Sequence, residues 1–246
     1  MFDIRECAAR TFRVTAILFL VTFSLGCPHY NAGVPAALRL PQLKPNNPVA
    51  GVYHNVEHNQ GLPEIAKAYE VDLQHLAEVN NLRPPYSIKA DTKIFVPGAS
   101  QQRPVAVGQK QLIEELRVQD FGGKLAWPVE GKIVSEYGVR GGIQYNGIDI
   151  QAEEGAPVRA AADGRVGRVG TIGEYGKVVL IEHANRLGTV YAHLKEIRVA
   201  NDQFVKRGEI IGTVGTSGRV ETPLLHFEVR SRSKPRNPLF FLGRRT

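Results

Sequence analysis

The first pattern along the chain is an apolar run from Val14 to Leu25, preceded by three arginines among the first 13 residues. The run is shorter than the roughly 20 apolar residues that a membrane-spanning helix needs. Basic residues followed by a short apolar core are typical of a secretory signal peptide. We therefore predict that residues 1–26 are a signal peptide and that the protein is exported.

The apolar positions of residues 51–98 predict a small α+β domain. A short strand candidate covers Tyr53 to Val56, and apolar residues then recur at helical spacing from Leu62 to Tyr69. Asp72 is a typical N-cap for a second helix, and residues 93–97 form another β-prone run. The predicted order is strand, helix, helix, strand.

Residues 124–246 predict an all-β domain, because short β-prone runs alternate with glycine-containing turns. The clearest of these runs are Lys177–Glu182, Thr189–His193, Glu209–Val214 and His226–Val229.

Two segments lack a sustained apolar pattern. Residues 27–50 are rich in Pro, Asn and Ala, which predicts an extended tether. Residues 99–123 are a predicted linker, within which residues 111–119 can form a short helix. Such a helix could bind a partner or act as a passive spacer, and the sequence leaves both readings open.

The end of the signal peptide, Ser24-Leu25-Gly26-Cys27, resembles a lipobox, in which the cysteine becomes the acylated N-terminus. The usual leucine three positions before the cysteine is Ser24 here, so an ordinary cleaved signal is the alternative. Cys27 is the only thiol left after cleavage, which excludes an internal disulfide. Pro28 in place of Asp favours the outer membrane, which implies an outer-membrane lipoprotein facing the periplasm.

The charge is concentrated at the C-terminal end. The net charge is +7, and residues 121–246 carry 19 Lys and Arg against 13 Asp and Glu. Basic surfaces attract nucleic acid, lipid headgroups or acidic polymers. Export makes nucleic acid an unsuitable partner.

Residues 51–98 resemble a LysM domain, through the strand at Tyr53, the segments LPEIAKAY and VDLQHLAEVNNL, and the closing IFVP. The resemblance implies a shallow groove for glycans that contain N-acetylglucosamine. It also implies which positions line this groove, although all five could simply be turn residues: Gln60, Gly61, Leu62, Ser87 and Ile88.

Four blocks in residues 124–246 resemble the LytM or lysostaphin type of zinc metalloendopeptidase, whose fold is a duplicated hybrid motif. They are Trp127-Pro128 with Tyr137-Gly138-Val139-Arg140, then Tyr145 to Ile150, then Tyr191 to Leu194, and finally Leu224 to Val229.

Active members of that class hold zinc through three protein ligands and leave one position for water. The resemblance places those ligands at Tyr145, Asp149 and His226, so one histidine ligand is replaced by a phenol. It places two further catalytic histidines at His193 and at position 224, which is Leu224. We therefore expect no zinc cofactor and no peptidase activity, with Asp149, His193 and His226 hydrogen-bonded to one another. Vestigial zinc binding is the alternative.

The other histidines offer no obvious replacement ligand. His183 follows a strand pattern and is predicted to be a surface or turn residue, and His54, His58 and His75 are predicted to be solvated.

A LysM domain before a degenerate LytM domain on a lipoprotein resembles the NlpD-like murein hydrolase activators. This implies binding to peptidoglycan and activation of a periplasmic N-acetylmuramoyl-L-alanine amidase when septal wall is split. An active zinc endopeptidase and a purely structural wall-binding tether are the alternatives.

Overall fold

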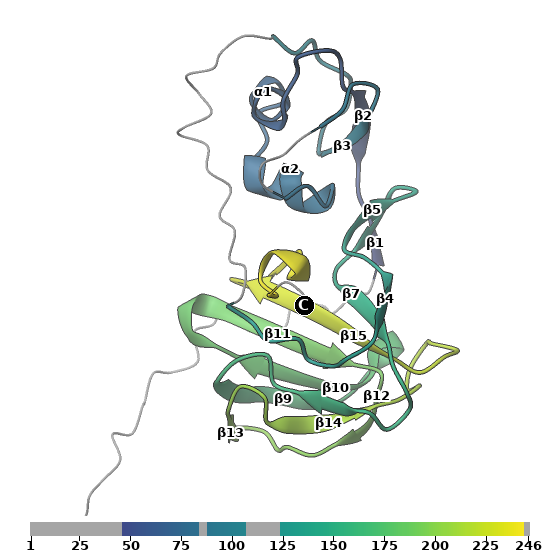
Figure 1. Cartoon of the computed structure of the whole chain (residues 1–246), viewed down its shortest axis with the longest axis vertical. Helices are drawn as coiled ribbons and strands as arrows, with labels where there is room; N and C mark the ends of the chain where they lie inside the picture. Colours follow the sequence, from purple (N-terminus) through teal and green to yellow (C-terminus); the bar gives the residue numbers. More distant parts are fainter. Residues whose placement is uncertain (1–45, 84–87, 107–123, 244–246) are drawn as a thin grey trace, which may run out of the picture. The chain divides into compact units, whose positions relative to one another are not determined.

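The computed structural model describes residues 46–83, 88–106 and 124–243 (Figure 1). The predicted signal peptide, Cys27, most of the tether, Ser87 and the helix predicted at 111–119 lie outside these residues. All of these described residues fall within one compact unit. Within the described ranges, no helix is both long enough and apolar enough to cross a membrane.

Residues 51–97 fold in the predicted order of strand, helix, helix, strand. Strands β2 (Gly51–Asn55) and β3 (Lys93–Pro97) form an antiparallel pair, and helices α1 (Leu62–Ala68) and α2 (Leu73–Val79) lie between them in sequence. This confirms the small α+β domain.

Local chemistry explains why these helices begin where they do. Pro63 occupies the first turn of α1, where its missing N–H is not needed. The Asp72 side chain accepts a hydrogen bond from the backbone N–H of His75 at 2.7 Å, which confirms it as the N-cap of α2. Leu62, Ile65 and other apolar residues of both helices are fully buried, so the helical apolar spacing marks the core face.

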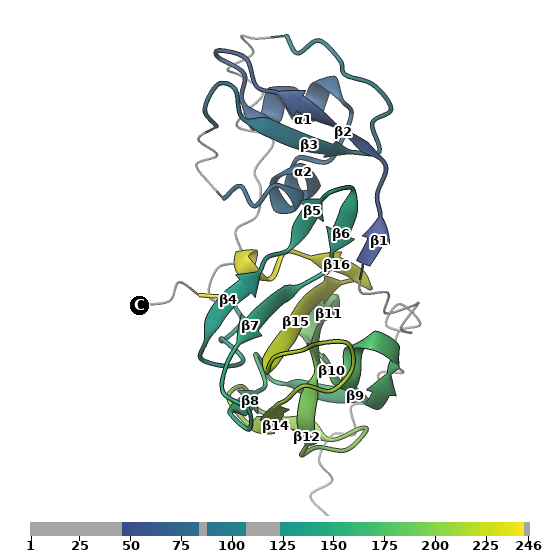
Figure 2. The ribbon, with the colours of Figure 1, turned by 90° about the vertical axis from the view of Figure 1, so that its right-hand side faces the viewer.

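The C-terminal domain is built on one large antiparallel sheet (Figure 2). In order across the sheet its strands are β13 (Phe204–Val205), β9 (Gly164–Ile172), β10 (Gly176–Glu182), β11 (Leu187–Ala192), β15 (Leu224–Ser231), β7 (Ile148–Gln151) and β4 (Lys132–Ser135). A short strand, β16 (Lys234–Arg236), also pairs with β15.

Two smaller sheets complete the domain. One has the order β12 (Leu194–Ile197), β14 (Ile210–Val214), β8 (Pro157–Arg159), and the other has the order β1 (Asn46–Pro48), β6 (Ile143–Tyr145), β5 (Gly138–Arg140). Short 3-10 turns lie at Gly173–Tyr175, Ala184–Arg186 and Pro238–Phe240. The described part of the domain has no α-helix, so the predicted all-β class is confirmed.

One difference from the sequence prediction is the end of the tether. Asn46–Pro48 forms strand β1 and pairs antiparallel with β6, instead of remaining unpaired. A tether composition gives no sign of this, because strand pairing uses backbone groups that every non-proline residue carries.

Candidate functional site

The site begins with two neighbouring strands. Strands β7 and β15 pair so that Asp149 lies directly opposite His226. Residues directly opposite each other on one face of an antiparallel pair have side chains in contact. The His226 Nδ1 and Asp149 Oδ1 atoms are 2.6 Å apart, so the predicted contact between these two residues is present.

A buried carboxylate supports His226 from its other side. Glu228 lies two residues further along β15, on the same face, and is fully buried. Its Oε1 lies 3.2 Å from His226 Nε2 and accepts a hydrogen bond from the Tyr175 hydroxyl at 2.5 Å. The Arg230 guanidinium donates to Glu228 Oε2 at 2.7 Å. Both oxygens of the buried Glu228 carboxylate therefore have partners.

The sequence analysis missed Glu228, Tyr175 and Arg230. The alternation His226, Glu228, Arg230 along one strand was a usable signal, since residues two apart share a face. Tyr175 gave no signal, because only the fold brings its hydroxyl to Glu228.

The charges of this cluster stabilise one another. Burial disfavours the charged form of His226, but hydrogen bonds and charges from Asp149 and Glu228 outweigh it and raise the pKa of His226 to about 9. Burial also opposes ionisation of Glu228, yet His226 and Arg230 hold the pKa of that carboxyl below its usual value. These interactions favour the imidazolium form of His226, which lies between Asp149 and Glu228.

His193 lies beside this cluster without bonding to it. It follows β11 in a left-handed conformation with φ of 62°, and its Nδ1 is 2.8 Å from the carbonyl oxygen of Ser217. The rings of His193 and His226 are 6.0 Å apart between centroids. Burial lowers the pKa of His193. Hydrogen bonding therefore joins Asp149 to His226, whereas His193 is held by the backbone.

Tyr145 and Leu224, which stand at the two positions where the resemblance expects histidines, both pack against other parts of the domain. The Tyr145 ring, on β6, lies 3.7 Å from the Arg140 guanidinium. Arg140 is itself held by the carbonyl of Glu136 and the hydroxyl of Ser135. Leu224 begins β15 and is 8% exposed. A tyrosine stacked against a guanidinium and an apolar side chain thus stand where the resemblance expects histidines.

A hollow of about 360 Å³ lies at this site. Asp149, His193 and His226 lie on its wall together with Tyr145, Glu174 and Arg219. Arg219 donates to Glu174 across the surface at 2.7 Å. The hollow is accessible, so it can accept a ligand or a partner segment.

The donor set does not fit a zinc ion. Asp149 and His226 are hydrogen-bonded to each other, and the third ligand position carries a tyrosine covered by a guanidinium. In the described part of the chain, no three His, Cys, Asp or Glu side chains are grouped so that they could hold a metal. A cation held against the ring of Tyr145 also opposes a second positive charge there.

The LysM-like glycan positions divide into two kinds. Gln60 and Leu62 are buried, and Gln60 accepts hydrogen bonds from the backbone of Glu57 and contacts His54 at 2.8 Å. Gly61 and Ile88 are partly exposed. The side chains of Gln60 and Leu62 therefore support the module, and the glycan site stays a prediction.

The histidine predictions need one correction. His54 is not solvated: it is buried, and its ring nitrogens contact the Tyr69 hydroxyl at 3.0 Å and Gln60. His58 and His75 are exposed, as predicted. His183 is half-buried and contacts the Asp163 carbonyl and the Thr189 hydroxyl, which leaves it away from the hollow.

The fold defines a protein that joins a LysM domain to a peptidase-type β domain. Two family models match: LysM domain over residues 62–97 and Peptidase family M23 over residues 144–238. The Escherichia coli lipoprotein YgeR is 30% identical over 207 residues, covering 78% of this chain and 82% of YgeR. The chain therefore belongs to the family of LysM and M23 domain proteins that includes YgeR.

Two longer relatives share only part of their length with this chain. The murein hydrolase activator NlpD of Escherichia coli is 39% identical over 120 residues, which are 48% of this chain and 31% of NlpD. The DD-carboxypeptidase/endopeptidase Mpg of Neisseria meningitidis is 46% identical over 95 residues, which are 39% of this chain and 22% of Mpg. The chain is thus similar both to an activator and to an enzyme.

Proposed function

We propose that this protein is an envelope lipoprotein that binds peptidoglycan through its LysM domain and activates an N-acetylmuramoyl-L-alanine amidase for septal wall splitting. The observation that carries the proposal is the hollow at Asp149 and His226, which is accessible and in which the described residues present no group of three side chains able to hold a metal. Similarity to the murein hydrolase activator NlpD supports the same function.

The hollow could activate an amidase by binding to it, without catalysing a reaction itself. Its rim carries the exposed Arg219 and Glu174 pair, and its floor carries the buried network around His226. A segment of the amidase would bind in this hollow only when the amidase is in its open, active conformation. The population of amidase molecules would therefore shift from the closed to the open conformation, to the extent that this protein binds the open one more tightly. The hydrogen bonds around His226 would keep the floor of the hollow rigid while the amidase segment binds.

A reconstituted assay tests this proposal. Purified amidase is incubated with peptidoglycan sacculi, with and without this protein, and the separation of peptides from the glycan strands is measured. We expect release to rise several-fold with the protein present and to remain absent with the protein alone.

A matched pair of variants locates the activating surface. Arg219→Ala removes a cation from the rim of the hollow and should reduce stimulation, whereas Arg198→Ala removes another exposed, ion-paired arginine, directly after β12, and should not. Equal stimulation by both variants would show that the hollow is not the surface used.

An active endopeptidase is the second candidate, because the chain matches the M23 family and is similar to Mpg. Zinc content by mass spectrometry and a digest of sacculi without amidase separate the two functions. Stoichiometric zinc together with cleaved peptide crosslinks would favour the enzyme. A wall-binding tether would instead bind sacculi and affect neither reaction.

A further inference from the structure

We propose that the LysM module (residues 51–98) and the β domain (residues 124–243) are locked together as one rigid body, so that the hollow is held in a fixed orientation relative to the LysM module. The structural part of this inference is independent of amidase activation, and its consequence for activity rests on the proposed function. Three kinds of contact carry it.

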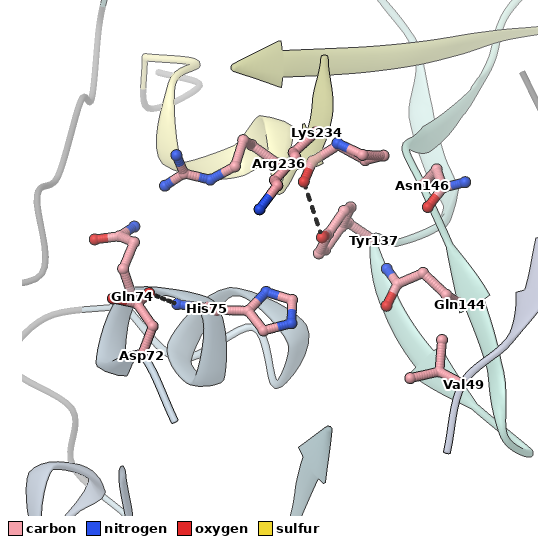
Figure 3. Close-up of a pocket in the computed structure, with 10 residues that line it drawn as sticks. Val49, Asp72, Gln74, His75, Tyr137, Gln144, Asn146, Lys234 and Arg236 are labelled. Carbon is pink, nitrogen blue, oxygen red and sulfur yellow. Dashed lines mark hydrogen bonds between the residues drawn. The ribbon is translucent and has the colours of Figure 1, made fainter. Parts of the chain in front are cut away.

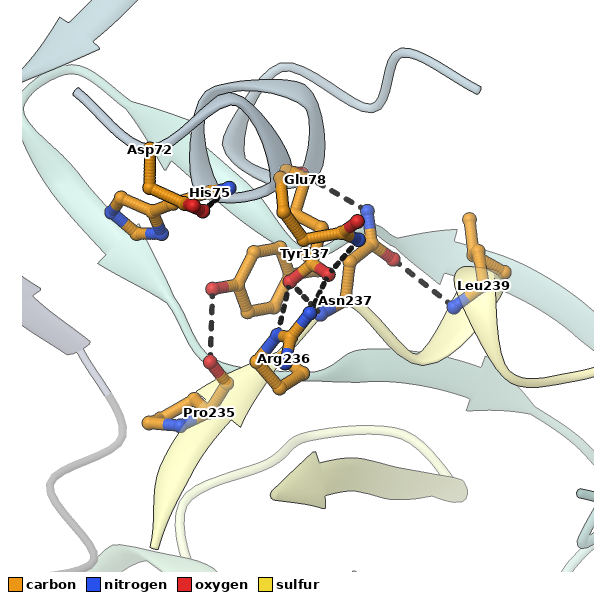
Figure 4. Close-up of polar contacts among 9 residues, drawn as sticks. Asp72, His75, Glu78, Tyr137, Pro235, Arg236, Asn237 and Leu239 are labelled. Atoms are coloured by element: carbon orange, nitrogen blue, oxygen red, sulfur yellow. Dashed lines mark hydrogen bonds and ion pairs between the residues drawn. The ribbon is translucent and has the colours of Figure 1, made fainter. Parts of the chain in front are cut away.

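The first contact is a polar latch centred on Glu78 (Figure 4). Glu78 lies on α2 and is fully buried. The Arg236 guanidinium, from β16, donates to both of its oxygens, with Nε 2.8 Å from Oε2 and Nη2 2.5 Å from Oε1. A two-pronged pair of this kind fixes orientation as well as distance, because both hydrogen bonds must align at once.

Neighbouring amides extend the latch. Asn237 donates from its Nδ2 to the Glu78 carbonyl at 3.0 Å and to Asn81 Oδ1 at 2.5 Å. Asn81 in turn donates to the carbonyl of Tyr137 at 3.0 Å. Asn237 is itself fully buried. These bonds join the end of α2 to two separate segments of the β domain.

The second contact is apolar and includes a close backbone approach. Val79 and Phe95 of the LysM module form one buried cluster with Tyr137 of the β domain. At Gly138, with φ of +132°, an added Cβ would lie 2.6 Å from the carbonyl oxygen of Val79. Only glycine allows the two backbones to come this close.

The third contact is strand β1. It pairs with β6, and the backbone N–H of Val49 donates to the Gly142 carbonyl at 2.8 Å. The chain then enters β2 at Gly51, so very little backbone separates the pairing from the LysM module. The module is therefore attached at its entry as well as along α2.

A cleft of about 800 Å³ lies beside these contacts (Figure 3). Asp72 and His75 of the LysM module face Tyr137 and Lys234 of the β domain across it. Because its walls come from both modules, the cleft keeps its shape only while they are locked. When the LysM module is bound to peptidoglycan, the hollow at His226 would thus have a fixed orientation relative to the peptidoglycan.

The glycines of the β5–β6 hairpin provide a matched test. Gly138→Ala places a methyl group against Val79, whereas Gly141→Ala, also at positive φ, meets no atom within 4 Å. Amide hydrogen exchange of the full chain is measured by mass spectrometry for α2 and β16. We expect exchange at least tenfold faster in both segments for Gly138→Ala than for the wild type, with β15 unchanged. Gly141→Ala should match the wild type.

Charge removal gives a second route if Gly138→Ala disturbs the hairpin itself. Glu78→Gln weakens the pairing with Arg236 and should also speed exchange in β16, whereas Glu70→Gln, at an exposed position of the same module, should not. Fast exchange of α2 and β16 in the wild type, or unchanged exchange in both Gly138→Ala and Glu78→Gln, would overturn the rigid-body inference.

An activity measurement tests the consequence separately. Glu78→Gln should reduce amidase stimulation on intact sacculi while leaving stimulation on small soluble muropeptides unchanged, because only sacculi are large enough to hold the LysM module and the amidase at the same time. If Glu78→Gln stimulated the amidase as well as the wild type on both substrates, the contact between the modules would have no orienting role. Absence of stimulation by the wild type would instead contradict the proposed function, and the exchange result would stand.

Discussion

Glu228 shows how the remnant site is stabilised at the level of single residues. Its carboxylate has partners in His226, Arg230 and Tyr175, and no water-exposed surface. Removing one partner from a buried charge network leaves other charges uncompensated. The network therefore contributes to the stability of the domain.

We predict that Glu228→Gln lowers the free energy of unfolding by roughly 3 kcal/mol, as for other broken buried ion pairs. Urea denaturation of the full chain measures the change. Glu196→Gln, which affects an exposed pair with Arg198, should cost less than about 1 kcal/mol. Similar losses for both variants would mean that the buried network adds little to stability.

The two substituted positions give a prediction about metal. Tyr145→His restores a third donor beside Asp149 and His226, so zinc should bind at one ion per chain in a calorimetric titration. Turnover should stay low, because Leu224 cannot transfer a proton. Adding Leu224→His to this variant should produce measurable cleavage of sacculi.

Wild-type protein and Leu224→His alone are the controls for that titration, and neither should bind zinc stoichiometrically. Zinc-dependent cleavage by the wild type would contradict both the predicted loss of activity and the misfit of the donor set. Tyr145→His also removes the ring on which the Arg140 guanidinium stacks.

Helix α2 organises the LysM module at the level of elements. Asn80, the C-cap residue of α2, donates to the carbonyls of Leu76 and Phe95, each at 2.8 Å, and accepts from the Phe95 N–H at 2.8 Å. One amide side chain thus closes the helix and joins it to β3. Backbone groups on both elements depend on it.

We predict that Asn80→Ala lowers the free energy of unfolding of the LysM module by about 2 kcal/mol, because it leaves partly buried backbone groups without partners. It should also reduce co-sedimentation with sacculi. Asn55→Ala, at an exposed position of β2, should leave both unchanged. Unchanged binding and stability in Asn80→Ala would show that the helix and strand hold together without this bridge.

Anchoring belongs to the scale of the whole molecule. If Cys27 carries the lipid, Cys27→Ala should move the protein from the membrane fraction to the soluble fraction after cell lysis. Fractionation and immunoblotting measure the distribution. Cys7→Ala is the matched control, since Cys7 lies within the predicted signal peptide and should not alter the outcome. Retention of the Cys27→Ala variant in membranes would contradict the lipobox prediction.

The sequence by itself determined the elements and the class of each domain. The apolar spacing from Leu62 to Tyr69 and the cap at Asp72 define the two helices because both signals depend on residues only three or four positions apart. Short glycine-bounded β runs define the all-β domain for the same reason. The resemblance of its motifs to the LytM class also implied that Asp149 and His226 belong to one site, and the structure brings these two residues together.

Only the tertiary structure decided which distant groups meet. The bonds of Glu78 to Arg236, of Tyr175 to Glu228 and of His193 to Ser217 join residues far apart in the chain. Local patterns carry no information on such pairs, because burial and partner choice arise when strands and modules pack. The burial of His54 and the pairing of strand β1 have the same origin: each depends on a surface that exists only after folding.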